Sequence, residues 1–167
     1  MKKIESRRQL QQEVVGFRSR FKSVLLATAS PENVPDASYT PYILDQNGKI
    51  CIFVSQLAQH TSNLLDAPKA SLLWIANEAD SRNLFARRRL TLQCTVGEVA
   101  ASGEQRDQLL VQMQQTHGKT IEVLRSLPDF HLFSLEAYQG NYVRGFGQAF
   151  SATGDELLAW LENSSEK

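Results

Sequence analysis

A short run of basic side chains is the feature of this sequence best suited to binding an anion. The segment FARRRL places Arg87, Arg88 and Arg89 at the start of an expected strand. Because side chains alternate along a strand, Arg87 and Arg89 share one face and Arg88 points to the other. Guanidinium groups bind phosphate or carboxylate through paired hydrogen bonds. The run therefore predicts an anion clamp, although a solvated strand edge would use the same residues.

A second polar group stands in SQLAQHTSN, where a strand ends and a short helix begins. Thr61, Ser62 and Asn63 offer hydroxyl and amide groups at a helix start, where free backbone N–H groups also attract anions. A plain helix cap would use the same residue types. Together with the arginine run, this segment predicts one site for an anionic ligand, with His60 as a residue of its wall.

Other catalytic and metal-binding patterns are absent from the sequence. It contains no P-loop, no G-x-S-x-G turn and no H-E-x-x-H pair. His60, His117 and His131 lack the spacing of metal ligands, so no metal site is predicted. Cys51 and Cys94 lie far apart in apolar runs, which favours two buried free thiols.

The overall charge excludes two classes of partner. The formal net charge is zero, so no general attraction to nucleic acid or anionic lipid is expected. No apolar run approaches the length that spans a membrane, and the first residues do not form a secretory signal. We therefore expect a cytoplasmic protein that binds neither nucleic acid nor membrane.

The elements that must position these residues are mostly strands. Apolar spacings of three and four predict a helix over 1–22, a helical segment over 103–127, and a helix or tail over 154–167. Apolar runs of high strand propensity predict strands over 23–30, 39–44, 50–55, 70–78, 88–100, 130–137 and 141–150.

The connections between these strands favour an antiparallel arrangement. Asn47 and Gly48 indicate a hairpin turn, Gly97 a bulge, and 138–140 a short connection between the last two strands. Strands joined in this way, with helices at the ends and in one excursion, predict an antiparallel β-barrel with flanking helices. We expect one domain over 1–167.

Several sequence blocks resemble a known family. They read S-x-L-A-x-H-x-x-N-L, L-F-A-R-x-R-L-T, P-D-F-x-L-F and G-x-Y-V-x-G-F-G-Q-A-F, and the resemblance runs from about residue 17 to 150. In order and spacing they are similar to the pyridoxamine 5'-phosphate oxidase-like (FMN-binding) split barrels. Within that superfamily they most resemble the haem-utilisation proteins of the HugZ/HutZ type, which serve iron acquisition.

The resemblance implies a homodimeric split barrel with a cofactor in a cleft between the subunits. In the flavin branch the segments matching 55–63 and 87–89 hold the FMN phosphate, whereas in the haem branch the arginines suit the haem propionates. Asp129, in PDFHLF, matches an acidic residue that tunes the iron ligand across the dimer. The resemblance thus implies catalytic roles for Asp129 and His60 and cofactor-binding roles for Ser55, His60, Thr61, Ser62, Asn63, Arg87 and Arg89.

Three functions remain open at this point. The first is a haem-binding protein that degrades haem with oxygen and an external reductant, either a protein or a small molecule, or that hands haem on. The second is an FMN-dependent oxidoreductase, although flavin oxidases of the family often carry Arg-Lys where this chain has His60 and Thr61. The third is a non-catalytic haem carrier or storage module. The haem branch has its iron ligand in a C-terminal extension; the last histidine here is His131, so His60, His131 or another group are the alternatives.

Overall fold

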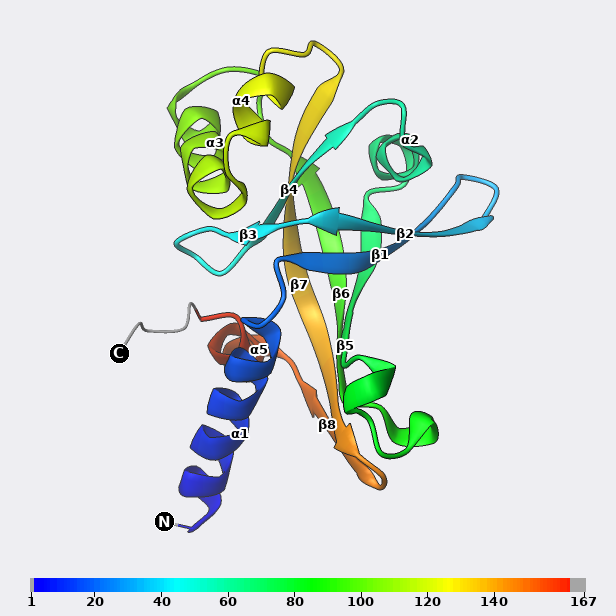
Figure 1. Ribbon diagram of the computed structural model, residues 1–167, viewed down its shortest axis with the longest axis vertical. Helices are drawn as coiled ribbons and strands as arrows, with labels where there is room; N and C mark the ends of the chain where they lie inside the picture. The colour runs from blue at the N-terminus through cyan, green and yellow to red at the C-terminus, as the bar shows by residue number, and fades with distance from the viewer. Residues whose placement is uncertain (1, 163–167) are drawn as a thin grey trace.

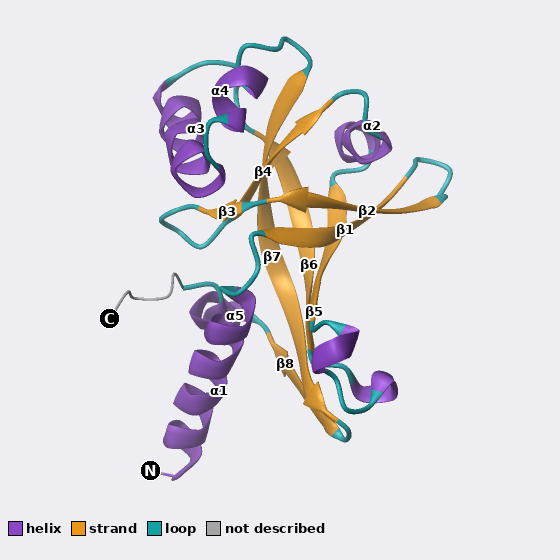
Figure 2. Cartoon of the chain, in the orientation of Figure 1, coloured by secondary structure: helices purple, strands orange, loops and turns teal. Residues whose placement is uncertain are grey.

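The structure is a computed structural model and describes residues 2–162 (Figures 1 and 2). Met1 and residues 163–167, which include the end of the helix or tail expected over 154–167, lie outside the described residues. The elements are α1 (Lys2–Arg18), β1 (Ser23–Ala29), β2 (Pro35–Pro41), β3 (Ile43–Leu44), β4 (Ile50–Ser55), α2 (Gln59–Asp66), β5 (Lys69–Ile75), β6 (Arg89–Glu98), α3 (Glu104–His117), α4 (Thr120–Leu124), β7 (Phe130–Gly145), β8 (Gln148–Ala152) and α5 (Gly154–Trp160), with two short 3₁₀ turns, η1 (Glu78–Asp80) and η2 (Leu84–Ala86), between β5 and β6.

The strands form one antiparallel sheet that curves into a split barrel. Its order is β2-β1-β5-β6-β7-β4-β3, and β8 pairs with the far end of β7. In Figure 1, β1 and β2 run across the long strands β5, β6 and β7, with α3 and α4 above them and α1 and α5 below. This architecture confirms the predicted mainly β fold, an antiparallel barrel with flanking helices.

Two apolar clusters stabilise this arrangement. The larger one fills the barrel and extends to α1 and α5, whose Val14, Phe17 and Trp160 are almost fully buried. The second lies between α3, α4 and the strands β4 and β7, and includes Phe53, Met113 and further apolar side chains. Burial of about 25 cal/mol per Å² of apolar surface makes such clusters the main stabilising contribution to the fold.

The last part of the sheet differs from the sequence prediction. Residues 138–140 do not connect two strands but lie inside the continuous strand β7, which turns only at Gly147, where φ is +69°. Gly140 reads as a turn in the sequence, but its position explains it: a Cβ atom there would lie 2.8 Å from Leu157 and 3.2 Å from Trp160. The glycine therefore allows α5 to pack closely on the strand.

Two smaller predictions about strands also need correction. The register of β6 shifts between Gln93 and Cys94, not at Gly97. The strand expected over 39–44 is interrupted between β2 and β3, where Tyr42 turns inward and donates its hydroxyl to the carbonyl of Phe21. Neither departure has a signal in local propensity, because each follows from contacts with distant segments.

Two further local predictions, the hairpin turn and the buried free thiols, are confirmed. The hairpin between β3 and β4 turns at Gly48, and Asp45 accepts hydrogen bonds from two backbone N–H groups within it. Cys51 and Cys94 are buried free thiols, and burial raises the pKa of each to about 12. Among the helices of the described residues, none is long and apolar enough to cross a membrane.

Candidate functional site

The turn between β4 and α2 is held by its own polar side chains. Thr61 is fully buried, and its hydroxyl donates to the carbonyl oxygen of Ser55 at 2.6 Å. Asn63 is also buried; its amide donates to the Thr28 hydroxyl at 2.9 Å and accepts from Gln59. Two of the three predicted anion-binding side chains thus already have partners inside the protein.

Ser62 is the exposed member of that group, because it lies on the outer side of α2. The first residue before the helix, Ala58, has no side chain that can cap it. The Thr61 hydroxyl, three residues further on, fixes the turn by donating to the Ser55 carbonyl, but it does not accept from a backbone N–H as a cap would. The sequence correctly predicts a helix start with polar side chains. However, the polar atoms of Thr61 and Asn63 form hydrogen bonds within the protein instead of remaining free for a ligand.

His60 is nearly buried, and its hydrogen bond assigns its protonation. Its Nδ1 lies 2.9 Å from the hydroxyl oxygen of Ser38, and that hydroxyl donates its own hydrogen to the carbonyl of Leu26. The Ser38 oxygen then accepts from Nδ1–H, so in the neutral imidazole Nε2 carries no proton. Burial lowers the pKa of His60, although Asp36 opposes this shift. A neutral imidazole with a free Nε2 can act as a hydrogen-bond acceptor or metal ligand.

Ser38 is a contact that the sequence interpretation missed. It stands 22 residues before His60, in β2, and only the packing of α2 against β1 and β2 brings the two together. The only local signal was a small polar residue in the alternating pattern of β2.

Asp129 and Ser55 meet at the same turn. The Ser55 hydroxyl donates to Asp129 Oδ2 at 2.7 Å, and the Asp129 backbone carbonyl accepts from the N–H of Gln56. Asp129 is half-buried, so its carboxylate is oriented but still reaches the surface. The structure therefore brings together Ser55, Thr61 and Asp129, three of the predicted site residues.

The predicted arginines lie in and beside η2 and the start of β6. Arg87 donates from Nε to the carbonyl oxygen of Ala76 at 3.1 Å and closes the loop that contains η1 and η2. Arg89 donates from Nη1 to the Arg87 carbonyl at 3.0 Å, and its other guanidinium donors have no hydrogen-bond partner among the described residues. Arg89 is therefore the member of the predicted clamp with the most donors available to a ligand.

The two predicted halves of the site lie far apart in one chain. β5 begins just after α2 and ends at Ile75, which pairs with Arg89. A strand of this length spans about 20 Å. We call these the α2 end and the arginine end of β5; Figure 1 shows them at opposite ends of the long strands. A single chain therefore does not unite the predicted clamp.

An apolar face extends along the outside of the sheet to the arginine end. Leu25 and Tyr39 lie opposite each other on β1 and β2 with 45% and 68% of their surface exposed. Leu73 pairs with Leu25, and Ile75 stands two residues further along the same face of β5. Because cross-strand partners share a face, Arg89 borders this outward apolar face, which consists of Leu25, Tyr39, Leu73 and Ile75.

Arg88 points to the other side of the sheet, as strand alternation predicts. Its guanidinium lies over the ring of Phe17 at 4.9 Å, and its Nε donates to the hydroxyl of Tyr142. Glu13 of α1 pairs with Arg88 at 3.2 Å and with Arg144 at 2.6 Å. Glu13 and Arg144 were missed in the sequence, because nothing local distinguishes them from the other charged residues.

No metal centre is evident in the part of the chain that the structure describes. Residues 2–162 contain no group of three or more His, Cys, Asp or Glu side chains arranged to hold a metal ion. His131 has a different partner: its Nδ1 lies 2.6 Å from Glu98 Oε1.

Comparisons with known proteins identify the relatives of this fold. The family model described as pyridoxamine 5'-phosphate oxidase matches residues 10–144. The haem oxygenase HutZ of Vibrio cholerae is 36% identical over 152 residues, which are 91% of this chain and 86% of that protein. A crystal structure of HutZ, there described as a haem storage protein, superposes with a TM-score of 0.72 at 32% identity and covers 87% of this chain and 96% of its own. ChuZ of Campylobacter jejuni superposes with a TM-score of 0.80 at 27% identity, over 89% of this chain and 61% of ChuZ.

Proposed function

The chain belongs to the pyridoxamine 5'-phosphate oxidase family, and from that premise we propose that it is a haem-utilisation protein that binds haem between two copies of itself. One observation carries this proposal. The α2 end and the arginine end of β5 hold complementary parts of a ligand site, but about 20 Å of strand separates them in one chain. A second copy can supply the missing half. The cytoplasmic location expected from the sequence stays a prediction.

The outward apolar face supports the assembly with a second copy. Exposed apolar side chains gathered on one face often mark an interaction surface. Tyr39 and Leu25 are the most exposed of this set, and the face is continuous with Arg89 through the pairing of Ile75. A homodimer would cover this face and place Arg89 of each copy at the rim of the resulting cleft.

The residues present fit haem. Haem combines a large apolar ring with two carboxylate groups, and the outward apolar face combined with Arg89 offers partners for both. Arg89 has the free donors for a propionate, and its Nη1 is held by the backbone carbonyl of Arg87, whose own guanidinium already binds the loop at Ala76. At the α2 end, Ser62 is the exposed polar side chain that can bind a carboxylate.

His60 and Asp129 have distinct roles in this proposal. The Ser38 hydroxyl keeps the proton of His60 on Nδ1, so that Nε2 remains an acceptor at the cleft wall. Ser55 fixes one oxygen of the Asp129 carboxylate, and the other can accept a hydrogen bond from a group of the second copy. Haem bound in this cleft would supply both the redox-active iron and the porphyrin ring that is oxidised. Electrons for that reaction would come from an external reductant.

Two alternative functions use the same cleft. An FMN-dependent oxidoreductase would need cations for the flavin phosphate at the α2 turn, and there the chain offers a neutral His60 and a buried Thr61. This argues for haem. A haem carrier requires the same binding residues without turnover, and the relative HutZ is described both as an oxygenase and as a storage protein.

A hemin titration tests the proposal. The purified protein should give a saturable Soret shift with hemin, and Arg89→Glu should weaken hemin binding about tenfold or more because it removes a charge-assisted hydrogen bond. Arg125→Glu is the matched control, since Arg125 is exposed on α4's end and its contact with Asp107 is 3.8 Å long. Retention of flavin bands through purification, with no saturable hemin binding, would overturn the proposal.

A second step separates degradation from transfer. Ascorbate is added to the hemin complex in air, and the Soret band is followed. Loss of the band with formation of open-chain tetrapyrrole products indicates degradation, whereas a persistent band indicates a carrier.

A further inference from the structure

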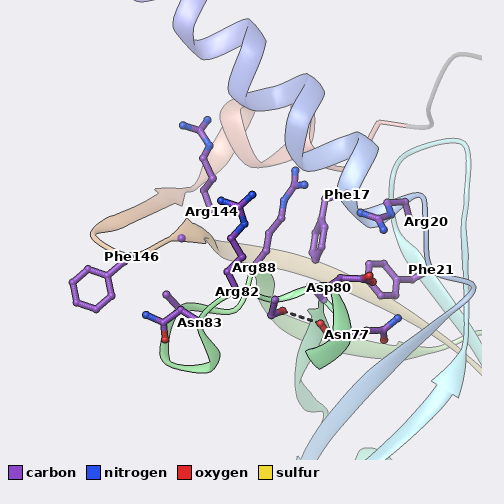
Figure 3. A pocket seen from close by; sticks show the side chains of 14 residues that line it. Phe17, Arg20, Phe21, Asn77, Asp80, Arg82, Asn83, Arg88, Arg144 and Phe146 are labelled. Carbon is purple, nitrogen blue, oxygen red and sulfur yellow. Dashed lines mark hydrogen bonds between the residues drawn. The ribbon is translucent and has the colours of Figure 1, made fainter.

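A second cavity lies on the other side of the sheet from the proposed haem cleft. It occupies about 560 Å³ between the end of α1, the loop with η1 and η2, and the turn from β7 to β8 (Figure 3). Ligand sites for small molecules typically measure roughly 300 to 1,000 Å³. Arg88 lines it, whereas Arg87 and Arg89 do not, because alternate residues of a strand face opposite ways. The cavity is therefore distinct from the cleft within one chain.

The charges around this cavity are unbalanced. Its walls contain four arginines, namely Arg20, Arg82, Arg88 and Arg144, and one acidic residue, Asp80. Glu13, just outside, pairs with Arg88 and Arg144. The four guanidinium groups and the carboxylates of Asp80 and Glu13 together carry a net charge of +2. This charge is complementary to the charge of about −1.5 to −2 on a phosphate monoester at neutral pH.

Two of the arginines have a structural explanation. Arg144 forms a forked contact with Glu13, with distances of 2.9 and 2.6 Å from its Nε and Nη2 to Oε2. Arg88 bonds to Tyr142 and Glu13. Burial alone would raise the pKa of Glu13, but the hydrogen bonds from Arg144 and Tyr142 outweigh this effect and lower it. These contacts fasten α1 to the barrel.

Arg82 and Arg20 have no such explanation. Neither guanidinium has a hydrogen-bond or ion-pair partner among residues 2–162, and both side chains are exposed at the cavity. In Figure 3, Arg82 lies with Arg88 and Arg144 on one side of the Phe17 ring, and Arg20 and Asp80 lie on the other. The contacts that fasten α1 do not involve Arg82, so its guanidinium donors are available to an anion in the cavity.

The other wall residues indicate what the anion is attached to. Phe21 is half-buried and presents its ring to the cavity, and Phe146, 81% exposed, stands at its open edge, whereas the Phe17 ring is almost fully buried and covered by Arg88 (Figure 3). Flat rings stack on such side chains and on guanidinium groups. Asn77 and Asp80 add acceptors for amino or hydroxyl groups.

We infer that this cavity binds a phosphate ester of an aromatic ring system, of the size of a nucleoside monophosphate. The phosphate lies against Arg82, Arg88 and Arg144, and the ring lies near Phe21. This inference does not depend on haem binding: a protein that fails to bind hemin can still bind such a ligand, and the reverse also holds.

Calorimetric titration of the full chain with AMP, adenosine and inorganic phosphate tests the inference. AMP should bind with one site per chain, and adenosine and phosphate should each bind at least about tenfold more weakly, because each lacks one half of the recognised chemistry. Arg82→Glu should weaken AMP binding about tenfold or more. Its midpoint of urea unfolding should not change, because the Arg82 guanidinium has no polar partner to lose within the described residues.

Arg125→Glu is the matched control and should bind AMP as the unmodified protein does. Absence of AMP binding at millimolar concentration would overturn the inference. Equal affinities for AMP and inorganic phosphate would also overturn it, since the ring would then contribute nothing. Loss of AMP binding in Arg89→Glu with normal binding in Arg82→Glu would assign the nucleotide to the opposite face and refute the site.

Discussion

At the α2 end of β5 the side chains of Thr61 and Asn63 are bonded inside the protein, whereas at the arginine end Arg89 and Arg82 keep unbonded donors. Both ends carry polar residues that look equally suited to a ligand in the sequence. In the structure the first end is a rigid wall with few free groups, and the second provides charge on both faces of the sheet. In the proposed haem site, the arginine end would therefore recognise the charge of the ligand, and the α2 end would orient it.

The largest effect is expected from a substitution that prevents the α2 end of one copy from meeting the arginine end of the second copy. Leu25→Glu places a charge in the centre of the outward apolar face and should convert the proposed dimer into a monomer that no longer binds hemin, because burying an unpaired charge is costly. Sedimentation velocity measures the mass. Leu158→Glu, on α5 and 56% exposed, is the control and should leave the mass unchanged. A dimeric Leu25→Glu protein would show that the two copies meet elsewhere.

The next change tests the rigidity of the α2 end. Asn63→Ala removes the buried amide that bonds to Thr28 and should lower the free energy of unfolding by roughly 1 to 3 kcal/mol, because it leaves a buried hydroxyl unsatisfied. Ser62→Ala, one residue away and exposed, should change it by less than about 0.5 kcal/mol. Urea unfolding measures both. If both variants lost a similar free energy of unfolding, the hydrogen bond of Asn63 would not stabilise α2 more than the exposed side chain of Ser62 does.

The smallest effect concerns the acidic residue near the arginine end. The pKa of Glu13 in the folded protein lies below its ordinary value of 4.5, so its ion pairs stabilise the fold above that pH and lose this contribution as the pH falls through the folded pKa. Glu13→Gln should cost about 1 kcal/mol at pH 7, since Arg144 is 40% exposed and solvent screens the pair.

The pH dependence provides the check on this last prediction. Thermal unfolding from pH 7 to pH 3 should show a smaller loss of stability in Glu13→Gln than in the unmodified protein, because the variant has no carboxylate to protonate at this position. Parallel stability curves for the two proteins would contradict the assignment of Glu13 as the fastening residue of α1.

Local patterns predicted the strands and turns well where the cause was local. The Asn47-Gly48 hairpin and the alternation of Arg87, Arg88 and Arg89 follow from backbone preferences that neighbouring residues set. The connection predicted over 138–140 was wrong, because the sequence does not distinguish a glycine within a strand from a glycine in a turn. Only the close approach of Leu157 and Trp160 to Gly140 distinguishes them.

The candidate site also combines features that the sequence predicted with features that only the structure shows. The sequence identified residue types that can bind an anion, among them Arg89 and Ser62, and placed His60 in the wall of the site. It could not reveal that the Thr61 hydroxyl is already bonded to Ser55, or that Glu13 pairs with Arg144 across 131 residues. Such pairings depend on chain segments that only the closed barrel brings together.

The sequence by itself determined the elements, the mainly β architecture and the chemistry available at each position, because propensity and side-chain periodicity act over a few residues. The tertiary structure decided which polar groups remain free for a ligand. It gave Thr61 and Asn63 at the α2 end partners within one chain, and it separated that end from the arginines by the length of β5. It also formed a basic cavity around Arg88 on the other face of the sheet. The physical reason is that a polar group must find a partner when it is buried, and which groups are buried depends on the packing of the whole fold.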